Sequence, residues 1–174
     1  LRGFALWLQS HRIPAYVPEG ELIPRRGQYS VPWIFTKRQI AEILDAASGL
    51  PNTYWPLRSL TYGTILLLLY TTGMRIGEAT GLRLKDISWP DRSLSIRDTK
   101  FFKSRLVVLS RSVARELESY VRQRNAAHAP QDPEAPCFWS PRGGKISVVA
   151  VRQAFRKVVV GLGWKFPLGV RGPR

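Results

Sequence analysis

The stretch TTGMRIGEATGLRLKDISW, residues 71–89, follows the most apolar part of the chain and decides how the fold is interpreted. The run before it contains TILLLLY, which predicts a buried helix over about residues 57–72, and Gly73 suits a left-handed helix cap. Arg75 comes two residues after that glycine, and Glu78 follows in a short helix over about residues 76–82. A permanent cation at the end of a buried helix is costly unless it has a partner.

Two interpretations of Arg75 are open from its neighbours alone. In the structural one, Arg75 is a surface cation that pairs with Glu78 one helical turn away. In the functional one, Arg75 binds a phosphate, because its guanidinium is planar, always charged and able to contact two oxygens. The sequence around this stretch is needed to choose between them.

The flanking sequence predicts a mainly α protein with a small three-stranded antiparallel sheet (α+β). A capping-box pattern at Thr36 and Gln39 opens a helix, Ser147 caps another that ends on glycines, and residues 112–124 are amphipathic. Alternating, β-branched segments predict the strands. The expected strands are residues 93–100, residues 104–110 and the short CFWS segment at 137–140, with residues 101–103 as the turn between the first two.

The charge points to a polyanionic partner. The 174 residues contain 27 Lys and Arg against 12 Asp and Glu, a formal net charge of +15. From residue 135 to the end there is no acid, and a surface that faces phosphates accounts for such a block. The cations of this block are Arg142, Lys145, Arg152, Arg156, Lys157, Lys165, Arg171 and Arg174.

Several other classes of protein are disfavoured. One cysteine and two scattered histidines argue against a zinc site, and no metal or other cofactor is expected. The longest apolar run, residues 65–69, falls far short of the roughly 20 residues that cross a bilayer. The first residues lack a signal-peptide pattern.

Three segments resemble the tyrosine recombinase (phage integrase) family. Residues 71–89 are similar to its arginine box, and TKFFKSRLVVLS, residues 99–110, is similar to its lysine hairpin. IFTKRQIAEILDAAS, residues 34–48, resembles the start of its catalytic domain. The resemblance implies that residues 1–13 are the last helix of a preceding core-binding domain, 14–33 a linker, and 34–174 the N-terminal portion of the catalytic domain.

The resemblance also implies a chemistry, in which a tyrosine attacks a DNA phosphodiester and the 3′-phosphotyrosyl link conserves the bond energy for rejoining. It implies double-stranded DNA and further protomers of the same recombinase as partners, and a bacterial or phage-encoded protein in the cytoplasm, on nucleoid DNA. Arg75 and Lys100 are the expected catalytic residues, with Glu78 orienting Arg75 and Lys103 as the rival of Lys100. The expected DNA-binding residues are Lys103, Arg105, Arg142, Lys145, Arg152, Arg156 and Lys157.

The sequence departs from the family after these boxes. No His-x-x-Arg box follows, no tyrosine occurs after Tyr120, and none of the six tyrosines is assigned as the nucleophile. We therefore expect this chain to hold the first half of an active site and to be inactive alone. The alternative is a non-catalytic DNA-binding protein derived from the same fold.

Two other classes of nucleic-acid protein fit less well. An RNA-binding protein would need aromatic side chains on a sheet, and Phe101 and Phe102 in a turn match that requirement poorly. A type IB topoisomerase shares the chemistry, but the arginine box resembles that of the recombinases more.

Overall fold

The computed structural model describes residues 2–19, 33–97 and 104–164. The chain divides after residue 33 into two compact units, and each is described by itself. In the smaller unit α1 spans Arg2–Ser10, so the helix expected at the start of the chain is confirmed. The Trp7 ring lies 6.0 Å from that of Phe4 and 4.2 Å from that of His11, measured between centroids. The assignment of this helix to a core-binding domain stays a prediction.

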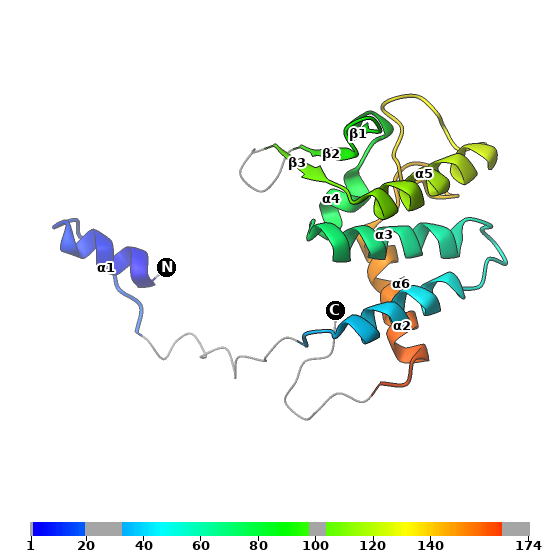
Figure 1. Cartoon of the computed structure of the whole chain (residues 1–174). Helices are drawn as coiled ribbons and strands as arrows, with labels where there is room; N and C mark the ends of the chain where they lie inside the picture. The colour runs from blue at the N-terminus through cyan, green and yellow to red at the C-terminus, as the bar shows by residue number, and fades with distance from the viewer. Residues whose placement is uncertain (1, 20–32, 98–103, 165–174) are drawn as a thin grey trace. The chain divides into compact units, whose positions relative to one another are not determined.

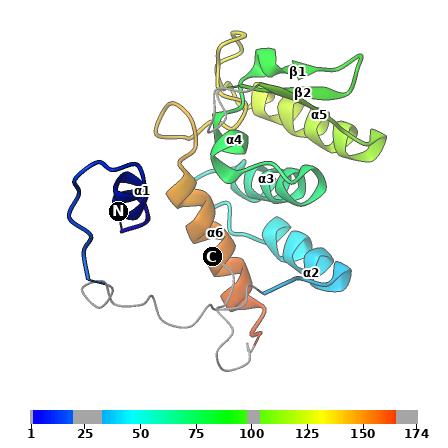
Figure 2. The ribbon, with the colours of Figure 1, turned by 90° about the vertical axis from the view of Figure 1, so that its left-hand side faces the viewer.

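The larger unit is mainly helical with one small sheet, as predicted. Figure 1 shows α3 lying between α5 and α2, and Figure 2 shows α6 running past α2 and α3 on one side. The sheet is antiparallel, with strand order β1-β2-β3. The elements are α2 (Lys37–Ser48), α3 (Arg58–Thr72), α4 (Ile76–Gly81), the 3-10 helix η1 (Leu84–Asp86), β1 (Ile87–Ser88), β2 (Ser93–Ile96), β3 (Arg105–Val108), α5 (Arg111–Ala126) and α6 (Val148–Gly161).

Local hydrogen bonds explain where the helices begin. Before α2, the Thr36 hydroxyl accepts from the Gln39 backbone N–H at 3.2 Å, and the Gln39 side chain accepts from the Thr36 N–H at 3.0 Å. This is the predicted capping box, which satisfies two donors that a helix start leaves free. Ser110 and Ser147 cap α5 and α6 in the same way, through one hydroxyl each.

The third strand was predicted in the wrong place. The residues that complete the sheet are Ile87 and Ser88 of β1, which pair with Leu94 and Ser93 of β2. The CFWS segment forms only one isolated bridge, from Trp139 to Lys145. Its backbone is engaged elsewhere: the Cys137 N–H donates to the carbonyl of Leu82 at 2.8 Å, and the Cys137 carbonyl accepts from two side chains, those of Tyr120 and Arg124. Groups that are already paired cannot join a strand ladder.

The main core lies between α3, α5 and the sheet. Ile65 and Leu68 of α3, Leu94 of β2 and Leu117 of α5 are completely buried. The apolar sequence of α3 follows from this central position, because neighbours cover it on more than one side. The core thereby holds both ends of the segment that carries Arg75 and Glu78, since α3 precedes it and β1 and β2 follow it.

Candidate functional site

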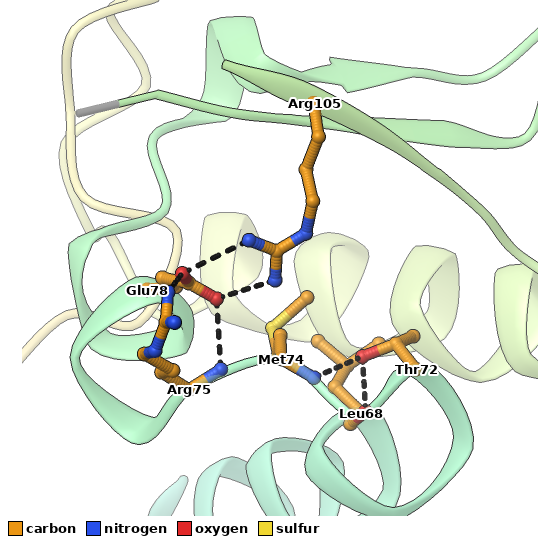
Figure 3. A network of polar contacts seen from close by, with 6 residues as sticks. All are labelled: Leu68, Thr72, Met74, Arg75, Glu78 and Arg105. Atoms are coloured by element: carbon orange, nitrogen blue, oxygen red, sulfur yellow. Dashed lines mark hydrogen bonds and ion pairs between the residues drawn. The ribbon is translucent and has the colours of Figure 1, made fainter. Parts of the chain in front are cut away.

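The turn between α3 and α4 leaves Arg75 little freedom. Gly73 adopts the predicted left-handed conformation, with φ of 63°. The Thr72 hydroxyl donates to the Leu68 carbonyl at 2.6 Å and accepts from the Met74 N–H at 3.3 Å, as Figure 3 shows. Met74 is buried in the core. Arg75 then occupies the cap position of α4, so its backbone is held from both sides.

Glu78 holds Arg75 at two atoms. One carboxylate oxygen accepts from the Arg75 backbone N–H at 2.8 Å, and the other accepts from its guanidinium at 2.9 Å. The Glu78 side chain is only 8% exposed, whereas that of Arg75 is 60% exposed. Glu78 therefore lies beside Arg75, as the sequence predicted; its role in orienting Arg75 for catalysis stays a prediction. No further protein partner of the Arg75 guanidinium is found in the described residues, so several of its five N–H groups face solvent.

Arg105 reaches the same carboxylate from the sheet. Its two terminal nitrogens donate to the two oxygens of Glu78, at 3.1 and 2.7 Å. In Figure 3 Arg105 approaches Glu78 from β3, while Arg75 approaches from the start of α4. This contact was not predicted from the sequence. No pattern in the sequence marks Arg105 as a partner of Glu78, because the two residues lie 27 positions apart and on different elements.

The two arginines decide the charge state of Glu78. Burial by itself would raise its pKa, but the hydrogen bonds from Arg105 and Arg75 outweigh burial, and the pKa lies below its usual value. Glu78 is therefore ionised at neutral pH, and one negative charge stands between two positive ones. The cluster keeps a net positive charge, which suits an anionic ligand.

Two hollows border the residues around Arg75. An apolar groove of about 410 Å³ is lined by Met74 and Ile76, the direct neighbours of Arg75, and by Arg152 of α6. A polar cleft of about 490 Å³ is lined by Glu78, by Arg97 at the end of β2 and by Lys145, among others. The structure thus brings Lys145 and Arg152, both predicted to bind DNA, close to the neighbours of Arg75.

The remaining predicted site residues fall into two groups. Lys100 and Lys103 lie outside the described residues. The other predicted DNA-binding residues are exposed and form no ion pair within the described ranges, apart from Arg105, whose guanidinium is bound to Glu78. Those unpaired cations are Arg142, Lys145, Arg152, Arg156 and Lys157.

Two of the tyrosines are unsuited to attack a phosphate. Tyr62 and Tyr120 are buried in the core, and Tyr120 donates its hydroxyl to the Cys137 carbonyl at 3.3 Å. Burial raises the pKa of both phenols, which makes the nucleophilic phenolate harder to form. Tyr16, Tyr54 and Tyr70 are exposed, and Tyr29 lies outside the described residues.

Neither a metal cluster nor a membrane-spanning helix emerges from the part of the chain that the structure describes. No three His, Cys, Asp or Glu residues there could hold a metal ion together. No helix there is long and apolar enough to cross a bilayer.

Comparison with known proteins identifies the family. The model of the phage integrase family matches residues 34–169, which include every element of the larger unit. The chain belongs to the phage integrase family. Its arginine turn, the β2–β3 hairpin and the basic helix α6 all lie within the matched range, so the resemblance noted in the sequence is confirmed.

Three similar proteins illustrate the relationship. A Sinorhizobium fredii protein named as a candidate integrase/recombinase, y4rB, is 31% identical over all of this chain and 56% of its own length. The tyrosine recombinase XerC of Rhizobium meliloti is 28% identical, over 94% of this chain and 49% of XerC. A lambda integrase tetramer bound to a Holliday junction matches 98% of this chain and 46% of the integrase chain, with a TM-score of 0.63 and 16% identity, which shows the fold. The chain spans about half the length of the curated relatives it matches.

Proposed function

We propose that this chain binds double-stranded DNA as part of a site-specific recombinase or integrase, and that Arg75 contacts the phosphodiester that is cleaved and rejoined through a phosphotyrosyl intermediate. One observation carries the proposal. Arg75 is held by Glu78 at its backbone and at one guanidinium nitrogen, while the rest of the guanidinium is exposed. The bond from the Arg75 backbone to Glu78 is the ordinary contact of a capping box, as at Thr36 and Gln39, so the exposed part of the guanidinium is what supports a role in binding.

The chemistry of phosphoryl transfer explains why such an arginine is useful. Negative charge builds up on the non-bridging oxygens of the phosphate, and donors that are already in place stabilise the transition state. Arg75 supplies these donors from a rigid helix cap. Lys100 would protonate the leaving 5′-oxygen, because a lysine can give up a proton and an arginine cannot. Lys103, two residues before β3 in the sequence, is the rival of Lys100 as this proton donor. If Lys100 donates the proton, Lys103 contacts the DNA backbone.

The surrounding cations supply the affinity for DNA. Lys145 lines the polar cleft together with Glu78, and Arg152 lines the apolar groove beside Met74 and Ile76. Arg142, Arg156 and Lys157 are exposed and unpaired among the described residues. Unpaired cations of this kind release counterions from DNA on binding, which favours association.

Partners and location follow from the same proposal. The family relationship, with the tetrameric, DNA-bound lambda integrase among the proteins of the same fold, supports assembly with further recombinase protomers on DNA. A recombinase acts where its DNA is, so we place this protein on the bacterial nucleoid. The proposed roles in DNA recombination and integration rest on the same relationship.

A salt titration tests DNA binding. The affinity of the chain for a fluorescein-labelled duplex is measured by anisotropy at several salt concentrations. The logarithm of the binding constant should fall linearly with the logarithm of salt concentration, by roughly 0.9 for each phosphate contacted. A binding constant independent of salt would refute the proposed DNA interface.

A nicked suicide substrate separates the recombinase from the alternative, a non-catalytic DNA-binding protein of the same fold. Such a substrate traps a covalent phosphotyrosyl adduct on a denaturing gel. We expect no adduct from the 174 residues alone, since Tyr62 and Tyr120 are buried and no tyrosine lies in a family motif. We expect cleavage when a protein that supplies the family tyrosine is added with this chain on one duplex. DNA binding without such cleavage would favour the alternative.

A further inference from the structure

Both ends of the β2–β3 hairpin are tied to the segment that follows Arg75. Arg97, the residue after β2, forms an ion pair with Asp86, with 3.1 Å between the guanidinium Nε and a carboxylate oxygen, in a geometry that does not align a hydrogen bond. Arg105, the first residue of β3, binds both oxygens of Glu78. The side chains of Glu78 and Asp86 are each only 8% exposed. A buried acid therefore stands opposite each arginine that flanks residues 98–103.

The two acids are themselves held in place. The second oxygen of Asp86 accepts from the backbone N–H of Arg83 at 3.0 Å, which fixes the carboxylate in η1. Glu78 is fixed by the backbone N–H of Arg75. Each tie thus joins a strand end to a carboxylate that a backbone N–H already orients. The carboxylate itself therefore has little freedom to move.

We propose that Asp86 and Arg97, together with Glu78 and Arg105, are positioning residues that set the ends of the hairpin relative to Arg75. The proposal rests on the proposed function, in which Lys100 acts on the phosphate that Arg75 binds. Lys100 is three residues from Arg97 and five from Arg105 in the sequence, so both residues flank the segment that carries it. Fixing both strand ends therefore limits where this lysine can reach.

The two ties act on strands that the rest of the fold supports unequally. β2 lies between β1 and β3, and its Leu94 and Ile96 are buried in the core. β3 is an edge strand that pairs with β2 over four residues, and its Leu106 and Val108 are exposed. The Glu78–Arg105 tie therefore holds the less supported strand, and the Asp86–Arg97 tie holds the backbone just beyond Ile96, the last buried residue of β2.

Distance measurements between two spin labels test the proposal without DNA. One label is placed at Leu106→Cys, on the exposed outer face of β3, and the other at Glu118→Cys on the exposed side of α5. The native Cys137 is completely buried, and burial raises its pKa to about 12, so it does not compete for the label. The chain is then compared with Arg97→Gln, Arg105→Gln and the double variant. Arg83→Gln is the control, because it loses the same charge and an ion pair with Glu134 away from the hairpin.

Arg97→Gln and Arg105→Gln should each broaden the distance distribution by roughly twofold, since a strand end freed of its tie samples more positions, and the double variant should broaden it further. Arg83→Gln should match the parent chain, and Arg97→Lys, which can still pair with Asp86, should restore most of the narrow distribution. Far-UV circular dichroism should be unchanged in every variant.

Distributions as narrow in Arg97→Gln and Arg105→Gln as in the parent would overturn the proposal. Equal broadening in Arg83→Gln would overturn it too, since that would assign the effect to lost charge. These readouts are taken without DNA, so they stand or fall separately from the proposed function, which the salt titration tests.

Discussion

Glu78 and Arg105, 27 residues apart in the sequence, form a bidentate ion pair with distances of 3.1 and 2.7 Å. The same carboxylate binds the backbone and guanidinium of Arg75. A single buried acid therefore connects the arginine turn to the strand that follows the lysine-bearing segment. Arg75 and that strand cannot move apart without breaking hydrogen bonds to a charged group, which are among the stronger ones in proteins.

Replacing Glu78 should destabilise the fold more than replacing an exposed acid. In Glu78→Gln the neutral amide weakens the bonds to Arg75 and Arg105 in a buried setting, so we expect the free energy of unfolding to fall by about 1–3 kcal/mol. Urea denaturation measures this quantity. Glu134→Gln is the matched control, because it also loses contacts to two cations, Arg83 and Lys85, but on the surface, where solvent screens the contacts and the cost should be clearly smaller. Equal losses of unfolding free energy in Glu78→Gln and Glu134→Gln would show that burial does not strengthen the contacts of Glu78.

The contribution of Glu78 should disappear in acid. Its pKa is lowered in the folded chain, so the stabilisation is complete at pH values above the unfolded pKa, about 4.5, and is lost as the pH falls through the lowered folded value. Glu78→Gln cannot titrate. The difference in unfolding free energy between the parent chain and Glu78→Gln should therefore be large at about pH 7 and shrink at about pH 3. A difference that stays constant over this range would show that Glu78 is not the titrating group.

Removing Arg75 should weaken DNA binding by the amount of one phosphate contact. Its exposed guanidinium is free to meet a phosphate, so Arg75→Ala should reduce the salt slope by roughly one unit. The control is Arg38→Ala, which removes an exposed arginine at the start of α2. Like Arg75, Arg38 pairs with an acid on its own helix, in this case Glu42. Arg38→Ala should leave the slope nearly unchanged. Parallel slopes for the parent chain and Arg75→Ala would exclude Arg75 from the DNA interface.

We expect Arg124 to be essential for the stability of the fold and to make no contact with DNA. It is completely buried and donates to the carbonyls of Cys137, Pro136 and Pro130, at 3.0, 2.9 and 2.6 Å. Arg124→Met removes the donor to the Pro130 and Pro136 carbonyls and leaves the Cys137 carbonyl with Tyr120 alone, at a cost of about 3 kcal/mol or more in unfolding free energy. Arg122→Met, on the exposed side of α5, should change it by less than about 0.5 kcal/mol. Thermal or urea unfolding distinguishes the two. An unchanged stability in Arg124→Met would mean that water replaces the guanidinium.

Arg124 also shows where sequence analysis was incomplete. In the sequence it is one of 27 cations, and nothing next to it differs from an exposed arginine of an amphipathic helix. It became structural because the segment 130–137 folds back over α5 and presents three carbonyls to it. The strand expected at residues 137–140 begins where this segment ends, and it did not form. The true third strand, only two residues long, lies before β2 and carries almost no sequence pattern of its own.

The sequence by itself determined the features that depend on neighbours a few residues apart. These are the capping box at Thr36, the left-handed cap at Gly73, the Arg75–Glu78 pair and the mainly α class, because helix-forming hydrogen bonds and apolar periodicity act within one or two turns. Only the tertiary structure decided that Arg105 shares Glu78 and that Arg97 meets Asp86. These pairs join residues 27 and 11 positions apart in the numbering, and they form only after the core has packed the sheet against α4 and η1. No local pattern specifies which of several acids a distant arginine will meet, because that choice is made by packing.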